Sequence, residues 1–338
     1  MARSRRGTRA GIQVLRPHAF DDVRLMAPCM RCKGEMMTTS RYEPRVSIGM
    51  PVYNGERYLA VTLDSLLTQT FEDFELIICD NASMDQTEQI CRSYAARDGR
   101  IRYVRHTENL GAAKNYWRAF ELAVGGYFRW ANCDDLFAPE SLARCVEVLD
   151  REQAVVLAYP QTQLIDERGQ AIAFYDDGLH LQSPKASDRF VQLFQNLGLV
   201  NVIYGLMRTD ALKQTGLIRN FVGGDIPLIA ELTLYGKFWE IPEALFYRRL
   251  HAGAQSNYRE VTQIQKFFDP KTEGQIPFRE WRHLFAHYGS VLQAPLGIIE
   301  KIRLGAYLAR QAIWSREELT GELVDAVQQI IHRHQWSA

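Results

Sequence analysis

The stretch Val46-Ser-Ile-Gly-Met-Pro-Val-Tyr-Asn54 decides the fold, because it contains a strand pattern and leads directly into a helix pattern. Val46, Ile48 and Met50 alternate along it, as one buried face of a strand requires. Apolar side chains at helical spacing follow, from Tyr58 to Leu67. The sequence therefore predicts a strand and then a helix that packs against it.

The same unit is repeated along the next hundred or so residues. Ser83 and Gln86 have the spacing of a capping box, which predicts the start of a helix. The further strands are expected at 74–80, 101–105, 127–131 and 155–159, and the helices at 83–97, 111–124 and 139–150. Strands that alternate with helices predict an α/β fold with a doubly wound, mainly parallel sheet.

After Tyr159 the alternation changes. We expect two short strands around the turn at 167–169, a helix near 188–197 and a strand at 201–207, which together indicate a mixed edge of the sheet. Residues 278–336 have helical spacing throughout. The predicted domains are an α/β domain at 45–255 and a C-terminal helical region at 256–338.

The first 44 residues show no periodicity and contain nine basic and four acidic residues, which predicts a disordered basic leader. Met36 or Met37 is an alternative start. Cys29 and Cys32 lack the second pair that a structural zinc site needs. No secretory signal and no membrane-spanning run is found, so we expect a cytoplasmic protein.

The chain of 338 residues has 40 basic and 40 acidic side chains, so its net charge gives no reason to expect a nucleic-acid partner. The neutrality is a cancellation between parts of the chain. Residues 1–44 carry +5, residues 45–247 carry −8 and residues 248–338 carry +3. An acidic core needs a cation before it can bind a diphosphate, and the basic ends could meet a membrane or a partner.

Ligands of an open α/β sheet bind beyond the carboxyl ends of its strands. Those ends are Pro51–Asn54, Asp80–Asn81, His106 and Asn132–Asp135. The glycine-rich loops of dinucleotide binders and P-loop enzymes are absent, and so is the serine motif of α/β-hydrolases. Hydride transfer, P-loop phosphoryl transfer and α/β-hydrolase chemistry are therefore disfavoured.

The strand ends carry groups that suit a nucleotide held by its base. Tyr53 offers a ring for stacking, and Asp80 offers an acceptor for the imide N–H of uracil or thymine. Asp134 and Asp135 could neutralise a diphosphate through Mg²⁺ or Mn²⁺.

Five motifs in this order resemble family 2 glycosyltransferases, which have the GT-A fold. They are Pro51-Val-Tyr-Asn54, Asp80-Asn-Ala-Ser-Met-Asp85, Asn109-Leu-Gly111, Asn132-Cys-Asp-Asp135 with Pro139, and Gly224-Asp225. The resemblance covers residues 45–255 and implies inverting transfer of a sugar from a nucleotide donor, with a metal.

The resemblance also implies the roles of the site residues. Asp225 would be the catalytic base. The donor would contact Pro51, Tyr53, Asn54, Asp80, Asn81, Lys114 and Asp134, and the metal would be held by Asp134, Asp135 and His251. Two positions depart from the family pattern: Asn132 replaces the first aspartate of Asp-x-Asp-Asp, and Gly224 replaces a common glutamate before the base.

Several of these residues also have a structural interpretation. Asp225 could cap a helix, His251 and Tyr53 could belong to the core, and Asp85 suits the first turn of a helix better than a substrate contact. Lys114 could lie on a solvated helix face.

The C-terminal helices combine basic and aromatic residues, among them Arg279, Arg282, Lys301, Arg303, Arg310, Trp281, Phe285 and Trp314. Such a stretch can lie on an anionic membrane, at the inner face of the cell membrane, where a lipid-linked glycan acceptor would be found. Packing on the catalytic domain or in a homodimer is the favoured alternative.

The sequence thus predicts a metal-dependent inverting glycosyltransferase that uses a UDP- or dTDP-sugar and a sugar or lipid-linked acceptor, in polysaccharide or glycolipid synthesis. A sugar-nucleotide pyrophosphorylase and a non-catalytic nucleotide-sugar-binding protein remain alternatives. The pyrophosphorylase usually has a glycine- and arginine-rich loop after the first strand, and Pro51–Asn54 is not one.

Overall fold

The computed structural model describes residues 43–253, 261–272 and 278–335. Residues from Glu43 to the C-terminus form one unit. The predicted leader, with its cysteine pair and Met36 and Met37, lies outside the described residues except for its last two positions. Among the described helices, none has the length and apolar composition needed to cross a bilayer.

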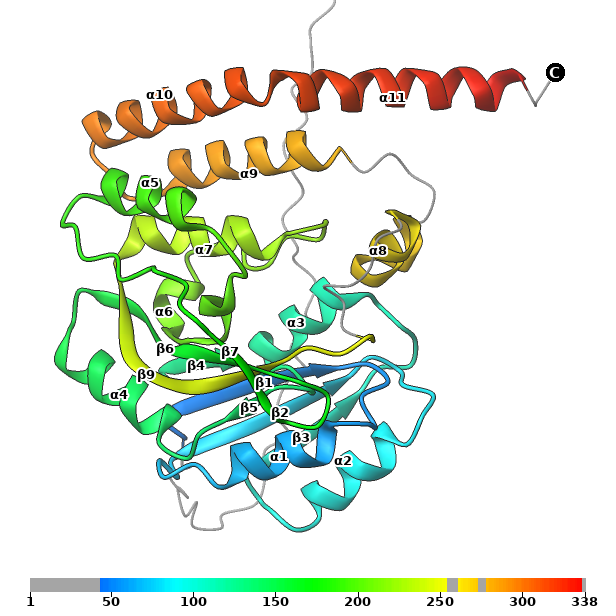
Figure 1. Cartoon of the computed structure of the whole chain (residues 1–338), viewed down its shortest axis with the longest axis vertical. Helices are drawn as coiled ribbons and strands as arrows, with labels where there is room; N and C mark the ends of the chain where they lie inside the picture. The colour runs from blue at the N-terminus through cyan, green and yellow to red at the C-terminus, as the bar shows by residue number, and fades with distance from the viewer. Residues whose placement is uncertain (1–42, 254–260, 273–277, 336–338) are drawn as a thin grey trace, which may run out of the picture. The chain divides into compact units, whose positions relative to one another are not determined.

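A mixed sheet of nine strands forms the centre of the molecule (Figure 1), in the order β3-β2-β1-β4-β8-β6-β9-β5, with β7 added on β6. β1 to β4 are mutually parallel, whereas β8 runs antiparallel to both β4 and β6. The strands are β1 (Val46–Val52), β2 (Phe74–Asp80), β3 (Ile101–Arg105), β4 (Tyr127–Trp130), β5 (Leu136–Phe137), β6 (Val155–Ile165), β7 (Ala171–Tyr175), β8 (Leu206–Arg208) and β9 (Lys237–Arg249).

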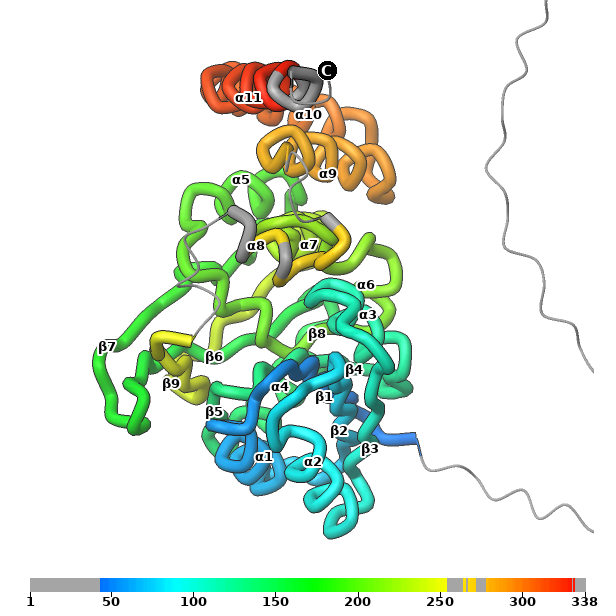
Figure 2. Tube along the Cα trace, turned by 90° about the vertical axis from the view of Figure 1, so that its right-hand side faces the viewer, coloured from blue at the N-terminus to red at the C-terminus, as the bar shows by residue number. Residues whose placement is uncertain are grey.

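Helices cover both faces of this sheet (Figure 1). The α-helices are α1 (Leu59–Leu67), α2 (Thr87–Ala95), α3 (Ala112–Glu121), α4 (Ser141–Arg151), α5 (Ala186–Asn196), α6 (Thr209–Leu212), α7 (Asp225–Tyr235), α8 (Val261–Phe268), α9 (Arg279–Gln293), α10 (Ile298–Trp314) and α11 (Arg316–Gln335). α1, α2 and α4 share one core with β1, while α5, α7, α9 and α10 share the core on the opposite side. α9 lies between α7 and the outermost pair α10 and α11 (Figure 2).

The alternation in β1 explains why it lies at the centre. Val46, Ile48 and Met50 are fully buried in the core formed with α1 and α4. The intervening Gly49 faces the other side, where a Cβ would lie 2.9 Å from Ala119 of α3. Only a glycine lets α3 approach the strand this closely.

The structure confirms the predicted α/β class, the mixed edge and the helical C-terminus. The strand expected at 201–207 is wrong over its first part, because Asn201–Tyr204 form a 3₁₀ turn that follows Val200 at φ 58° and only Leu206–Arg208 pair as a strand. The capping box is also wrong: α2 begins at Thr87, and the Ser83 hydroxyl accepts the Asn54 N–H instead.

The long strand β9 was not predicted over most of its length. Its pairing with β6 shifts register between Pro160 and Thr162, which breaks any simple alternation. β6 likewise continues to Ile165 and forms a hairpin with β7. The last residue of β9 returns to the loop after β4, where the Arg249 N–H donates to Asp135 and the candidate site lies.

Asn115 of α3 ties the ends of β1 and β2 together, because its amide donates to the carbonyls of Cys79 (2.9 Å) and Val52 (3.4 Å) while only 2% exposed. We expect Asn115→Leu to lower the free energy of unfolding by about 2 kcal/mol, since it leaves buried carbonyls without donors. Urea denaturation measures this. The matched Asn196→Leu change on the exposed end of α5 should cost under about 0.5 kcal/mol, and equal losses would contradict the prediction.

Candidate active site

The loops that follow β1 and β2 are fastened to each other at the edge of the sheet. Asn54 adopts φ 51°, a conformation that asparagine tolerates better than most residues. Its N–H donates to Ser83 Oγ (2.9 Å), and its Oδ1 accepts the N–H of Met84 (2.9 Å). Pro51 is buried at the end of β1, whereas the ring of Tyr53 is 41% exposed above it. Tyr53 is therefore a surface aromatic group, not a core residue.

Asp80 lies at the end of β2 and is fully buried. Its carboxylate accepts the Ser83 N–H at 2.9 Å and the Tyr103 hydroxyl at 2.6 Å, and Arg105 Nε lies 3.3 Å away. Burial, together with the bond to Asp80, raises the pKa of Tyr103, so the phenol stays protonated and keeps donating. The nucleobase of a donor could reach this carboxylate only after the side chain of Arg105, which is one third exposed, moves aside.

Asn81 and Lys114 both make contacts around the start of α3. Asn81 donates to Asn109 Oδ1 and accepts the Leu110 N–H, both at 2.8 Å, which shapes the loop before the helix. Lys114 Nζ contacts Asp269 Oδ2 at 3.4 Å, just after α8. Gly111 at φ 85° allows this packing, because a Cβ there would overlap the Phe268 carbonyl. The ammonium group thus faces a late segment of the chain.

Asp134 and His251 come together from positions 117 residues apart. Asp134 Oδ2 and His251 Nε2 are 2.9 Å apart, with side-chain exposures of 26% and 11%. An edge contact with the Tyr58 ring at 5.0 Å orients the imidazole. A carboxylate oxygen and an imidazole nitrogen on one partly exposed point suit a divalent cation that takes its other ligands from phosphate and water. Among the described residues, no third His, Cys, Asp or Glu completes a cage there.

Asp135 is directed differently from its neighbour. Its side chain is 2% exposed, and it accepts the Arg249 N–H (2.8 Å) and the Asn132 amide (3.2 Å). Burial first, and then the charge of Asp134, raise the pKa of Asp135 to about 7. Its bonds connect the loop after β4 to β9, so the carboxylate has a structural role whether or not it also meets a metal.

The hydrogen bonds around Asn132 explain why this position carries an amide and not a carboxylate. Asn132 Oδ1 accepts the Tyr116 hydroxyl at 2.8 Å, and its Nδ2 donates to Tyr204 Oη at 2.6 Å as well as to Asp135. An aspartate here would lose both donated bonds and would add a third carboxylate beside Asp134 and Asp135. The departure from Asp-x-Asp-Asp is therefore compensated by the surrounding hydroxyls.

Asp225 is the first residue of α7, and the N-cap is Gly224. The preceding turn is tight, with Gly223 at φ 74°. His283 of α9 contacts this turn, since its Nε2 lies 3.0 Å from the Val222 carbonyl oxygen. Because a carbonyl can only accept a hydrogen bond, the Nε2 atom carries the proton and donates it. Burial raises the pKa of Asp225, which brings the carboxylate closer to the basicity of a useful proton acceptor. The backbone N–H groups of Asp225 and Ile226 counter part of this rise, so the carboxylate also interacts with the start of α7.

Arg248 connects the parts of the site electrostatically. Its positive charge counters a small part of the rise that burial causes in the pKa of Asp135 and in that of Asp225. Arg248 also donates to the Leu199 carbonyl at 3.0 Å. Arg249, by contrast, is 5% exposed and donates to backbone carbonyls, including that of Asp134 at 2.9 Å.

Several residues of the site were missed from the sequence. Tyr116, Tyr204 and His283 lie in elements with unremarkable apolar patterns, and Asp177 follows a hairpin strand. Asp85 lies before α2 and not in its first turn, and it accepts the N–H groups of Glu56 and Thr87. Only the three-dimensional contacts distinguish these groups from ordinary core and surface residues.

The mixed sheet with polar and acidic side chains at its strand ends has counterparts among known proteins. The sequence model described as Glycosyl transferase family 2 matches residues 47–216. An uncharacterized glycosyltransferase of Rickettsia typhi is 26% identical over 241 residues, which cover 68% of this chain and 71% of the relative.

Solved structures of the same fold agree. S. aureus TarS in complex with UDP-GlcNAc superposes with a TM-score of 0.58 at 17% identity, over 84% of this chain and 81% of that one. The mannosyltransferase PcManGT from Pyrobaculum calidifontis, in complex with GDP-Man and Mn²⁺, gives 0.50 at 17% identity, over 85% and 76%. The chain belongs to glycosyltransferase family 2 and is a glycosyltransferase. The pyrophosphorylase alternative is therefore wrong.

Asp177, beside the site, gives a test of the electrostatics. It is 4% exposed, its Oδ1 accepts the Asn201 N–H, and burial raises its pKa to about 7. The folded protein thus holds this proton more tightly than the unfolded chain does. The resulting stability is complete below about pH 4 and is lost as the pH rises through 7.

We expect the free energy of unfolding of the wild type to decrease as the pH rises from 4 to 7. This decrease should be larger than that of Asp177→Asn by on the order of 3 kcal/mol. Urea denaturation at several pH values measures both slopes. Asp210→Asn, which changes a carboxylate on an exposed side chain, should keep the wild-type slope. A slope that Asp177→Asn leaves unchanged would contradict the buried, neutral carboxyl.

Proposed function

We propose that this glycosyltransferase inverts the anomeric carbon of its donor sugar in one displacement, with Asp225 as the general base. The observation that carries the proposal is the position of Asp225 at the start of α7, where its side chain is partly buried and burial raises the pKa of the carboxylate. The carboxylate takes the proton of the acceptor hydroxyl as the oxygen attacks the anomeric carbon. The nucleoside diphosphate leaves from the opposite side.

The donor is a UDP- or dTDP-sugar in this proposal. Tyr53 stacks on the base, Pro51 and Asn54 fix the loop that presents the ring, and Asp80 accepts the imide N–H once Arg105 has moved. Asn81 shapes the loop before α3, and Lys114 can exchange Asp269 for a phosphate oxygen. The solved relatives bind UDP-GlcNAc in one case and GDP-Man in another, so the base is a point for experiment.

Asp134 and His251 would hold Mg²⁺ or Mn²⁺ on the donor diphosphate. The imidazole favours Mn²⁺, because Mg²⁺ takes oxygen ligands almost exclusively. When bound, the cation stabilises the negative charge that develops on the departing diphosphate. Asp135, although also predicted as a ligand, orients Asp134 through its bond to the Arg249 N–H.

The acceptor is a sugar or a lipid-linked glycan, which would place the enzyme in polysaccharide or glycolipid synthesis, in the cytoplasm or at the inner face of the cell membrane. Its hydroxyl would approach the Asp225 carboxylate at the start of α7.

Asp225→Asn should lower the transfer rate by roughly 10²- to 10⁴-fold, because the amide cannot accept the hydroxyl proton. Donor binding should persist, since Asp225 does not contact the diphosphate in this proposal. Transfer is followed by release of the nucleoside diphosphate, and binding by calorimetry.

The control is Asp210→Asn, which removes another carboxylate from the first turn of a helix. It should leave transfer unchanged. Near wild-type transfer by folded Asp225→Asn would remove the base assignment. Absence of turnover of UDP- and dTDP-sugars by the wild type with manganese would instead contradict the proposed donor.

Asp134→Asn should abolish the part of nucleotide binding that depends on manganese. A ligand at 100 times its Kd stabilises the folded state by about 2.7 kcal/mol, which a thermal shift detects. We expect UDP with Mn²⁺ to raise the Tm of the wild type more than UDP without metal does. For Asp134→Asn, UDP should raise the Tm by the same amount with and without Mn²⁺. Asp210→Asn is again the control. A metal-dependent shift that survives in Asp134→Asn would contradict the cation site.

A further inference from the structure

The outer face of α10 is apolar and exposed. Five large side chains there are between 62% and 71% exposed: Ile298, Ile299, Ile302, Ile313 and Trp314. The opposite face packs on α5 and α9 through Leu304, Tyr307 and Leu308, which are at most 9% exposed. The sequence left open that this helix packs on the catalytic domain. Such packing explains the buried face of α10 but not the exposed one.

The charges on α10 are arranged around that apolar face. At about 100° per residue, the exposed positions form one continuous arc of about 160° that runs from Ile298 to Trp314. Arg303 and Arg310 lie inside the arc next to Trp314, and we call this side the arginine border. Lys301 lies outside the arc beyond Ile298, where its Nζ donates to the Leu292 carbonyl at 2.7 Å. No exposed position of α10 carries a carboxylate, because Glu300 is turned inward to the Ser187 N–H (2.8 Å) and to Arg303 (2.9 Å).

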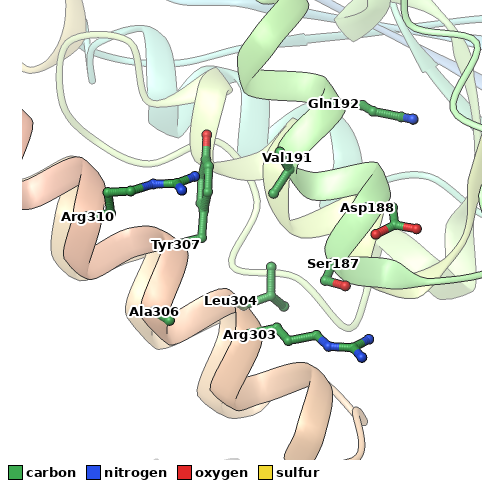
Figure 3. A pocket seen from close by; sticks show the side chains of 9 residues that line it. All are labelled: Ser187, Asp188, Val191, Gln192, Arg303, Leu304, Ala306, Tyr307 and Arg310. Atoms are coloured by element: carbon green, nitrogen blue, oxygen red, sulfur yellow. The ribbon is translucent and has the colours of Figure 1, made fainter.

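The arginine border opens on a groove of about 540 Å³ between α5 and α10 (Figure 3). The groove is lined by Ser187, Asp188, Val191, Gln192, Arg303, Leu304, Ala306, Tyr307 and Arg310. Arg310 lies against the rings of Tyr307 and Trp314, at 5.6 and 5.1 Å, and has no carboxylate partner among the described residues. The carboxylate of Asp188 accepts a hydrogen bond from the Ser183 hydroxyl (2.9 Å).

We propose that the α10 face docks on an anionic phospholipid surface. Ile298, Ile302 and Ile313 enter the acyl boundary, Trp314 lies at the headgroup level, and Arg303 and Arg310 contact lipid phosphates beside the groove. An exposed apolar face with arginines along one side and no exposed carboxylate suits a helix that lies in an anionic membrane interface. This docking does not depend on the proposed reaction.

The charge pattern favours lipid over a second copy of the chain. The exposed arc of α10 is purely cationic and apolar, so it is complementary to a surface of one sign. A copy of the same face would bring like charges together in a two-fold contact. α11 is less suited to anionic lipid, because Glu317, Glu318 and Asp325 are exposed on it.

The test is flotation of the full-length protein with vesicles of phosphatidylglycerol and phosphatidylcholine, and with pure phosphatidylcholine. We expect binding to the anionic vesicles only. Ile302→Glu with Ile313→Glu should abolish it, and Arg310→Gln should weaken it about fivefold, as loss of one cation near such a surface predicts. The matched control is Ile172→Glu with Phe174→Glu on β7, where the side chains are 54% and 56% exposed.

Thermal denaturation and donor binding confirm that each variant is folded and keeps its nucleotide site. Failure of the wild type to float with anionic vesicles, or equal flotation of both double variants, overturns the proposal. A wild type that is dimeric by light scattering without lipid, and that Ile302→Glu with Ile313→Glu converts to a monomer, would assign the face to a second copy. Loss of transfer with intact flotation concerns only the proposed reaction.

Discussion

The bond between the Asp135 carboxylate and the Arg249 N–H determines the geometry of the whole site. It joins the loop after β4 to the last residue of β9 at 2.8 Å, across 114 positions of sequence. Burying a carboxylate is costly unless its oxygens receive hydrogen bonds, and here an amide of Asn132 supplies a second one. Because Asp134 precedes this anchor and His251 follows it by two residues, the two potential cation ligands meet at 2.9 Å.

The edge of the sheet could be predicted from the sequence because parallel strands end on the same side. Tyr53, Asp80 and Asp134 each follow a strand with a clear apolar pattern, so their common location needed no knowledge of long-range contacts. The details of each side chain could not be predicted. Tyr103 and Arg105 cover Asp80, and nothing in the pattern of β3 indicates which of its residues face β2.

The later half of the chain was harder for a physical reason. β9 pairs with β6 through register shifts, and α8 is held to α3 by contacts such as that of Lys114 with Asp269. Such contacts depend on where two distant segments meet, which local periodicity does not encode. Val200 at φ 58° shows the same limit, since an apolar run that suggests a strand is bent into a 3₁₀ turn by one left-handed residue.

The C-terminal helices are part of the catalytic architecture through α9. Its His283 holds the Val222 carbonyl beside Asp225, while Glu322 of α11 accepts the N–H of Glu280 at 3.0 Å. α9 thus separates the loop of the proposed base from α10 (Figure 1). If α10 lies on a bilayer, two helices, α10 itself and α9, stand between lipid and base, a separation of about 20 Å. An acceptor anchored in that bilayer must then present its hydroxyl on an extended glycan or linker.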